Sequence, residues 1–388
     1  MVSKRIFSKK CILFFMFLFL IISFKPYNVS ANSVSISATT AVLIDQDTGQ
    51  VLYDKKMHIK RPPASTTKIL TAITAIEEAD VDDIVKVSRK AAYQEGSSIY
   101  LEPGEEITLK ELLYGIMLAS GNDAAVAIAE HVSDSVDNFA ELMNQKAREM
   151  GAQNSNFLNP NGLPQSGHYS TAYDLAVIMR YAMNNDLFAK ITGTKHKTIT
   201  WADHDWGRGL RNHNKMLWSY SAATGGKTGY TRAAGRCLVT SAAKGNRRLI
   251  AVVLNCPNDW MEIKRLLEYG FSNFKKVKAV RAGETIYKIP VDKSLEKELV
   301  LITEDKIDIV IPEGDKVKVK KEIIINPELD LPIKKDKEIG ELVIYHENLE
   351  VGRTDLLAAH DLNFASSFLR LWHKINVYLE NKLSKQEF

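Results

Sequence analysis

The sequence holds few of the residues that cross-link small exported proteins or bind metals. Only three of its 388 residues are cysteine, and none of them stands in a spacing that would hold zinc. The chain has no Gly-x-Ser-x-Gly turn, the usual setting of a serine that works with a histidine base. We therefore expect no disulfide-rich domain, no metal site, no cofactor and no conventional histidine-dependent serine hydrolase.

The apolar run from Cys11 to Phe24 spans about 14 residues, fewer than the roughly 20 that cross a bilayer as a helix. Lysine and arginine precede this run, and Val29-Ser30-Ala31 follows it as a small-x-small cleavage site. Residues 1–31 therefore predict a secretory signal that is removed before Asn32, with a transmembrane anchor as the alternative. We expect the mature protein to be exported to the outer face of the cytoplasmic membrane, facing the cell wall.

Removal of this signal changes the charge of the protein. The segment carries five of the 51 basic residues and none of the 47 acidic ones, so the remainder has 46 basic against 47 acidic residues, a net charge of −1. A chain of this charge has no electrostatic reason to bind nucleic acid, and we expect no such partner. Of the cysteines, Cys237 and Cys256 remain, and they either pair or stay as buried free thiols.

The pattern of residues 32–275 predicts an α+β (α/β) domain. Two apolar runs around Asp45–Gly49 predict a hairpin, and a helix is expected from near Ser65. Helical patterns cover Leu109–His131, Asn138–Met150, Thr171–Met183 and Trp260–Tyr269. Two strand-like runs, Arg236–Ser241 and Arg248–Asn255, precede the last of these helices. Ser120-Gly121-Asn122 interrupts the first of these helices, and Asp123 is expected to cap the helical segment after the interruption. Since strands occur at both ends of the region, we expect one antiparallel sheet packed with helices, together with a helical subdomain.

The last part of the chain divides into a β-rich segment and a helical tail. Residues 276–357 predict a small all-β domain without a catalytic signature, built from the β-branched runs Glu298–Ile302, Ile307–Ile311, Val317–Ile325 and Glu341–Tyr345. Residues 358–388 predict an amphipathic helix with Phe364, Phe368, Leu371 and Ile375 on one stripe. Such a helix either docks on its own protein or lies in a membrane surface, and Trp372 beside the stripe favours the membrane.

Three short motifs occur in order along the chain: Ser65-Thr66-Thr67-Lys68, Ser120-Gly121-Asn122 and Lys227-Thr228-Gly229. Ser-x-x-Lys recurs elsewhere, so it is weak evidence alone. Only the Ser65 copy follows Pro62-Pro63, a helix-start signal, and precedes both other motifs. The ordered triplet is typical of serine acyltransferases that use lysine in place of histidine.

Residue types at these positions support a covalent mechanism. Residues three apart on a helix share a face, so Lys68 can lie beside Ser65 and act as its base if its pKa falls. A helix N-terminus and the charge of Lys227 would both lower that pKa. Ser120 is expected to pass the proton to the leaving nitrogen, and Asn122 to hold a substrate amide.

The third motif predicts the edge strand that binds the substrate. Lys227 offers a positive charge to a terminal carboxylate, while Thr228 and Gly229 let an edge strand pair with an extended peptide. The backbone N–H groups of Ser65 and Tyr230 are the candidates for an oxyanion hole. His168 is expected to order a loop near the pocket.

The chain resembles the serine-type D-Ala-D-Ala carboxypeptidases, low-molecular-mass penicillin-binding proteins that trim peptidoglycan stem peptides. The resemblance covers essentially the whole chain after the signal, and the motifs that carry it are Ala64–Lys68, Ala119–Ala125, Asn159–Leu163, His168–Ala172 and Gly225–Tyr230. It implies a catalytic domain of the β-lactamase/transpeptidase type, removal of the terminal D-alanine through a serine acyl-enzyme, limited cross-linking, and covalent binding of β-lactam antibiotics. Glu95–Leu101 and Pro257–Trp260 are most similar to the sporulation-associated branch.

One feature departs from the family. Some members carry a carboxylate-binding arginine before the last helix of the catalytic domain, where this chain has Asn258-Asp259-Trp260, so Lys227 and Thr228 are expected to bind the carboxylate without it. Two rival functions stay open. A β-lactamase would need a second base, and no Glu-x-x-Leu-Asn occurs between Ser120 and Lys227. A silent penicillin-sensing or peptidoglycan-binding module would not need the nucleophile.

Overall fold

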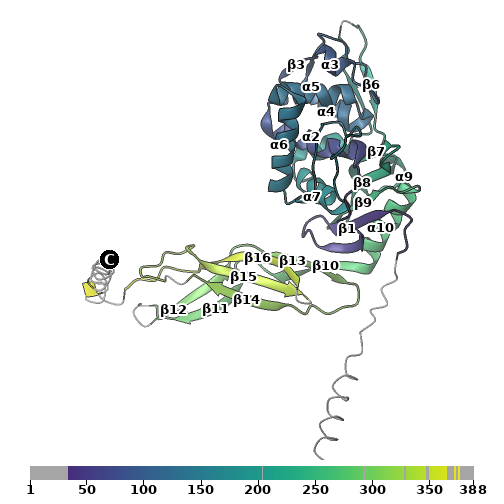
Figure 1. Cartoon of the computed structure of the whole chain (residues 1–388). Helices are drawn as coiled ribbons and strands as arrows, with labels where there is room; N and C mark the ends of the chain where they lie inside the picture. The colour runs from purple at the N-terminus through teal and green to yellow at the C-terminus, as the bar shows by residue number, and fades with distance from the viewer. Residues whose placement is uncertain are drawn as a thin grey trace, which may run out of the picture. The chain divides into compact units, whose positions relative to one another are not determined.

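The structure is a computed structural model that describes residues 34–202, 204–291, 294, 296–326, 329–346, 349–364, 371–372 and 375 (Figure 1). The chain separates into the units Met1–Ser35 and Ile36–Phe388, and the helices and strands named in the text all belong to the second unit. The predicted signal at residues 1–31 lies outside the described residues, as does most of the predicted tail helix. Among the helices that the structure describes, none is long and apolar enough to cross a membrane.

A five-stranded sheet forms the base of the catalytic domain, and every pairing in it is antiparallel, as predicted. Its order is β2-β1-β9-β8-β7, with bounds β1 Thr40–Asp45, β2 Val51–Lys55, β7 Ala223–Thr231, β8 Gly235–Lys244 and β9 Arg247–Leu254. The predicted hairpin forms β1 and β2, and distant segments complete the sheet. Strand β7 stands at one end of this order, beside β8, and is therefore an edge strand.

Helices cover this sheet and build a helical region beside it. The helical elements are η1 Ala64–Thr67, α2 Lys68–Glu78, α3 Arg89–Ala92, α4 Leu109–Tyr114, η2 Gly115–Ala119, α5 Asn122–Ser133, α6 Val136–Glu149, α7 Ala172–Ala182, α8 Asp186–Gly193, α9 Met216–Ser219 and α10 Asp259–Asn273. Two-stranded antiparallel sheets are formed by β3 Ile84–Lys86 with β4 Glu106–Thr108, and by β5 His196–Ile199 with β6 Arg208–Arg211. Both α7 and α10 pack against β9.

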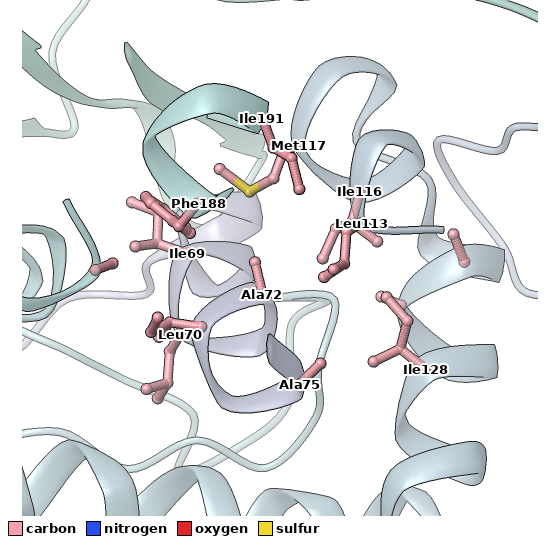
Figure 2. Packing of buried hydrophobic residues seen from close by; sticks show 14 of the residues in the cluster. Ile69, Leu70, Ala72, Ala75, Leu113, Ile116, Met117, Ile128, Phe188 and Ile191 are labelled. Carbon is pink, nitrogen blue, oxygen red and sulfur yellow. The ribbon is translucent and has the colours of Figure 1, made fainter. Parts of the chain in front are cut away.

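Helix α2 lies at the centre of the hydrophobic core (Figure 2). Its first eight residues are all buried, because α5, α6, α7, α8 and η2 pack against it. A helix that is covered on every side needs apolar or small residues around its circumference, and the sequence supplies them. The labelled contacts join Ile69, Leu70, Ala72 and Ala75 of α2 to Leu113, Ile116, Met117, Ile128, Phe188 and Ile191. This packing fixes the start of α2 in space.

The predicted long helix around Ser120 is divided into three parts. A π-helical turn, η2, follows α4, and Ser120 then takes a left-handed conformation with φ +65° before α5 begins. π-turns are rare and often stand at functional sites. The prediction that Asp123 caps α5 is wrong, because Gly121 is the N-cap residue and no side chain caps it.

The C-terminal region is all-β in its described residues, as predicted. One sheet pairs β10 Phe274–Val280 with β13 Ile307–Pro312. A second has the order β11-β12-β16-β15-β14, with bounds β11 Thr285–Pro290, β12 Glu298–Thr303, β14 Lys320–Ile325, β15 Glu338–His346 and β16 Leu349–Ala358. The sequence pattern missed β10, β11 and β16. Buried leucine, isoleucine and valine residues form a core separate from that of the catalytic domain.

Candidate active site

The predicted nucleophile lies at the junction between a 3₁₀ turn and a long helix. Ser65 belongs to η1, and Lys68 is the first residue of α2. The preceding Ala64 has φ +50°, a strained conformation for a residue with a side chain. Gly162 packs directly against this turn, since a Cβ atom there would lie 1.9 Å from the Ala64 carbonyl oxygen. The surrounding fold therefore holds the serine in a conformation that the local sequence does not favour.

Lys68 is fully buried and contacts the serine. Its Nζ lies 3.2 Å from Ser65 Oγ and donates to Asn122 Oδ1 at 2.7 Å and to the Asn161 carbonyl oxygen at 2.6 Å. None of these partners is a carboxylate. Burial and, after it, the charge of Lys227 hold the pKa of Lys68 well below its usual value. A lowered pKa makes the amine easier to deprotonate, which its predicted role as the acceptor of the Ser65 proton requires.

A second buried lysine faces the same site from the sheet. Lys227 Nζ donates to Ser120 Oγ and to the Thr228 carbonyl oxygen, both at 3.0 Å. Burial lowers its pKa from 10.5 to about 7. The structure thus brings together two serines, Ser65 and Ser120, each in contact with its own lysine.

Asn122 connects the helical region to the loop beside the site. Its Oδ1 accepts from Lys68, and its Nδ2 donates to the Glu95 carbonyl oxygen at 2.7 Å. An amide has two N–H donors and two acceptor positions, so one of each remains for a ligand. The geometry is compatible with the predicted contact to a substrate amide.

Ser65 lines a pocket of about 290 Å³. The residues that line it are Ser65, Ser97, Ser120, His213, Thr228, Gly229, Tyr230, Arg236, Asp259 and Trp260. Strand β7 approaches the serine closely, since a Cβ atom at Gly229 would lie 3.0 Å from both the Ser65 nitrogen and the Pro63 carbonyl oxygen. Because β7 is an edge strand, an extended peptide can pair with it beside Ser65.

A buried histidine orders the loop that reaches Lys68, as predicted. His168 Nδ1 accepts from the Leu158 N–H at 3.1 Å, so Nε2 carries the proton and faces Thr67 Oγ1 at 3.1 Å. Burial lowers the pKa of His168 to about 4. The same loop presents the Asn161 carbonyl to Lys68, a contact that the sequence did not indicate.

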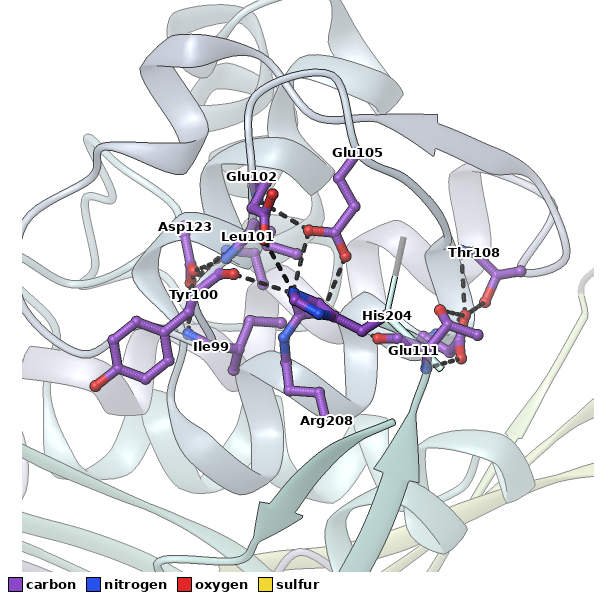
Figure 3. A network of polar contacts seen from close by, with 12 residues as sticks. Ile99, Tyr100, Leu101, Glu102, Glu105, Thr108, Glu111, Asp123, His204 and Arg208 are labelled. Carbon is purple, nitrogen blue, oxygen red and sulfur yellow. Dashed lines mark hydrogen bonds and ion pairs between the residues drawn. The ribbon is translucent and has the colours of Figure 1, made fainter. Parts of the chain in front are cut away.

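A polar network fixes the loop that contributes Ser97 to the pocket (Figure 3). Asp123 is not the N-cap residue of α5, although its Oδ1 accepts from the first-turn Ala124 N–H at 2.9 Å. Its carboxylate also accepts from the N–H groups of Ile99 and Leu101 and from Ser98 Oγ at 2.6–3.2 Å. Tyr100, between these residues, has φ +62° and an exposed ring that points away from the network. Asn122 N–H donates to the Ser97 carbonyl at 2.7 Å, so the loop and the active site are one hydrogen-bonded unit.

A buried ion pair closes this network. Arg208 Nη1 and Nη2 bind the two carboxylate oxygens of Glu105 at 3.0 and 3.1 Å, and Nη2 also donates to the Tyr100 carbonyl at 3.0 Å. Glu105 Oε2 also accepts from the Glu102 N–H at 2.9 Å. The two-stranded sheet of β5 and β6 is thereby joined to the loop that flanks Ser97.

Several pocket residues had no site role predicted from the sequence, because none of the three catalytic motifs contains them. Ser97, His213, Arg236 and Trp260 reach the pocket from four separate segments. Burial and the charge of Lys227 lower the pKa of His213. Both remaining cysteines are buried free thiols, which settles the alternative that the sequence left open. Within the described ranges, no group of three His, Cys, Asp or Glu side chains could hold a metal ion.

A larger cavity, of about 710 Å³, lies away from Ser65 beside Asp47, Arg248 and Lys276. Asp47 forms ion pairs with both cations. The described residues that line this cavity include no nucleophile next to a base, so chemistry and not volume identifies the pocket at Ser65.

Comparison with known proteins gives consistent matches. Residues 27–258 match the D-alanyl-D-alanine carboxypeptidase family Peptidase S11, and residues 274–363 match the penicillin-binding protein 5 C-terminal domain. The D-alanyl-D-alanine carboxypeptidase DacF of Bacillus subtilis is 39% identical over 337 residues, 84% of this chain and 86% of that protein.

Two solved structures extend this comparison. Penicillin-binding protein 5 from Haemophilus influenzae superposes with a TM-score of 0.73 at 30% identity, covering 85% of this chain and 99% of the other. A mutant of the Streptomyces K15 DD-transpeptidase superposes with a TM-score of 0.59 at 31% identity, covering 62% of this chain and 100% of the other.

Proposed function

The chain belongs to the D-alanyl-D-alanine carboxypeptidase family, and from that premise we propose that Ser65 is the nucleophile with Lys68 as its base. The protein is a serine-type D-Ala-D-Ala carboxypeptidase of the penicillin-binding type. The observation that carries the assignment of roles is the contact between Ser65 Oγ and a fully buried lysine amine without a carboxylate partner.

Acylation begins when Ser65 Oγ attacks the carbonyl carbon of the penultimate D-alanine and its proton passes to Lys68 Nζ. The backbone N–H groups of Ser65 and Tyr230 stabilise the oxyanion that forms. As the C–N bond breaks, the proton that Lys68 took from Ser65 passes through Ser120, which Lys227 holds in place, to the leaving D-alanine nitrogen, so that Lys68 is neutral again. Water then attacks the ester carbonyl, gives its proton to Lys68, and releases the shortened peptide and Ser65.

Substrate binding uses the remaining predicted residues. Lys227 and Thr228 attract the terminal carboxylate, Asn122 binds the amide of the acyl part, and the edge of β7, including Gly229, pairs with the extended stem peptide. This arrangement supports cleavage of peptidoglycan stem pentapeptides ending in D-Ala-D-Ala, which leaves fewer donors for cross-linking. A β-lactam would acylate Ser65 by the same route.

The rival functions fit this pocket less well. A β-lactamase needs a second base to hydrolyse the acyl-enzyme, yet the one carboxylate among the described lining residues, Asp259, is bound by Arg236. A silent sensor would not require the Ser65–Lys68 contact. One solved relative is named a DD-transpeptidase, so transfer to an amine is the alternative fate of the acyl-enzyme.

The test is mass spectrometry of peptidoglycan fragments after incubation with purified protein. Loss of one D-alanine from pentapeptides is the expected result, and Ser65→Ala should abolish it together with the penicillin adduct. Lys68→Arg should also lose acylation, because arginine stays protonated and cannot accept the serine proton. An adduct on another residue, or more than about a tenth of the acylation rate in Lys68→Arg, would contradict these roles, since general-base catalysis typically supplies about 10² to 10⁴ in rate.

We also propose that the protein acts outside the cell, at the membrane surface. Three described residues of the tail support this proposal, because Leu371, Trp372 and Ile375 expose 58%, 53% and 44% of their surfaces. Phe364, which was expected on the same helical stripe, instead pairs with Ser294 in an isolated β-bridge. A chain truncated after Phe364 keeps β16 and should lose binding to liposomes in a flotation assay while it retains activity. If the full chain fails to float, the tail is not a membrane anchor. The sporulation-associated role is a further proposal, which the time of expression would test.

A further inference from the structure

Arg236 contributes a cation to the catalytic pocket that the proposed steps do not use. It stands on β8 opposite Tyr230 of β7, two residues beyond Thr228 along that strand. Its side chain is 45% exposed and lines the same pocket as Ser65 and Thr228. The guanidinium is therefore accessible to a bound substrate.

Asp259 holds this guanidinium by one edge. Asp259 Oδ1 accepts from Arg236 Nε at 3.0 Å and from Nη2 at 2.9 Å, and it also accepts from the Trp260 N–H at 3.0 Å. The carboxylate is only 4% exposed, so the substrate meets the arginine and not the aspartate. Among the described residues, Nη1 has no protein acceptor. One edge of the guanidinium is thus fixed, and the donors of Nη1 remain for a ligand.

We infer that Arg236 binds a carboxylate of the substrate, with Asp259 as the residue that positions it. This inference rests on the proposed function. Some family members place an arginine before the last helix, where this chain has Asn258-Asp259-Trp260 and no arginine, whereas β8 supplies a guanidinium to the pocket. A stem peptide offers two sources of a carboxylate: the terminal D-alanine, and the side chain of a diamino acid that carries an acid group.

The register of β7 and β8 places Arg236 within reach of either carboxylate of a bound stem peptide. Successive strand residues rise by about 3.3 Å, so Tyr230 and its partner Arg236 lie about 7 Å along the strand from Thr228. Arg236 can therefore reach back to the terminal carboxylate beside Thr228 or receive an acid group on the acyl side of the scissile bond. The two sources share one chemistry and differ in the part of the peptide that presents it.

The test compares three pentapeptides in steady-state kinetics: one with lysine as third residue and a free C-terminus, its C-terminal amide, and one whose third residue carries a side-chain carboxylate. Arg236→Gln should lower kcat/KM about 10- to 100-fold for the peptide whose carboxylate the arginine binds, mainly through KM. Loss of the preference for a free C-terminus assigns the terminal carboxylate. Loss of the preference for the acid-bearing third residue assigns the side chain.

The matched control is Arg232→Gln, which removes an exposed cation from the turn between β7 and β8 without altering the pocket lining. It should leave both preferences unchanged. Arg236→Lys should recover only part of the preference, because lysine keeps the charge but not the guanidinium donors. Asp259→Asn should keep more of the preference than Asp259→Ala, since an amide oxygen can still accept from Arg236.

The inference is wrong if Arg236→Gln and Arg232→Gln have the same effect on all three peptides. It is also wrong if Arg236→Gln lowers kcat equally for every peptide, which indicates a structural role. Failure of the proposed function would look different, because the unmodified protein would then release no D-alanine from any of the peptides.

Discussion

Loss of Arg208 should destabilise the catalytic domain strongly. The Arg208 and Glu105 side chains are 4% and 0% exposed, so Arg208→Met leaves a buried carboxylate without its counter-ion. Breaking a buried pair from one side typically costs about 3–5 kcal/mol in the free energy of unfolding. For a domain of this size, about 2–4 °C of melting temperature correspond to each kcal/mol, so we expect Tm to fall by about 6–20 °C.

Two comparison variants make this prediction specific to burial. Lys244→Gln breaks an ion pair with Glu268 whose side chains are 43% and 41% exposed, and it should cost at most about 1 kcal/mol. The double variant Arg208→Met with Glu105→Leu removes both charges and should recover more than half of the loss. Full recovery is not expected, because the Glu102 N–H and the Tyr100 carbonyl each lose a partner.

The assay is thermal unfolding followed by circular dichroism, together with the rate of penicillin acylation well below Tm. Acylation should slow in Arg208→Met, because the loop that this pair holds also presents Ser97 to the pocket. The reasoning is refuted if Arg208→Met shifts Tm no more than Lys244→Gln does. It is also refuted if the double variant is as unstable as the single one.

The site geometry supports three further predictions. Gly162→Ala should slow acylation by about 10²-fold, because the new Cβ atom would collide with the Ala64 carbonyl next to Ser65. Gly104→Ala is the control: its φ is similar, but a Cβ atom there has no neighbour within 4 Å, so acylation should keep its rate. The pKa of His168 is about 4 in the folded state and about 6.5 in the unfolded chain, so the unfolded chain alone binds a proton between these values. The free energy of unfolding should therefore fall as the pH drops from about 6.5 to about 4. His168→Gln should reduce this pH dependence, which denaturant titrations at several pH values would measure. Since the pKa of Lys227 is about 7, the KM of a peptide with a free C-terminus should rise above that pH, and the KM of its amide should not.

The order of the three motifs determined the chemistry from the sequence alone. Ser65 and Lys68 are neighbours because they are three residues apart in a local helical turn, and no distant contact is needed to predict that. The antiparallel catalytic sheet was equally predictable, since strand-like runs such as those of β8 and β9 stand far along the chain from the hairpin that they complete. Local patterns and their order were enough for both conclusions.

The limits of the sequence appear where residues far apart in the chain meet. Asp123 was expected to cap a helix, but Gly121 is the N-cap residue, and the loop at Ile99–Leu101 donates hydrogen bonds to Asp123. The missed strands β10 and β11 are only partly buried and carry several lysines, so their apolar alternation is weak. Neither result can be read from a short window of residues.

Only the tertiary structure decided that Lys68 can act as a base. A lysine in the first turn of an isolated helix is solvated and charged, and its pKa falls here because α2 is buried and Lys227 faces it. The Asn161 carbonyl and the Arg236 guanidinium reach the site from positions 96 and 171 residues beyond Ser65. The sequence by itself predicted which groups react, whereas desolvation and the meeting of distant segments, which depend on the whole packed domain, decide the pKa values and the contacts of these groups.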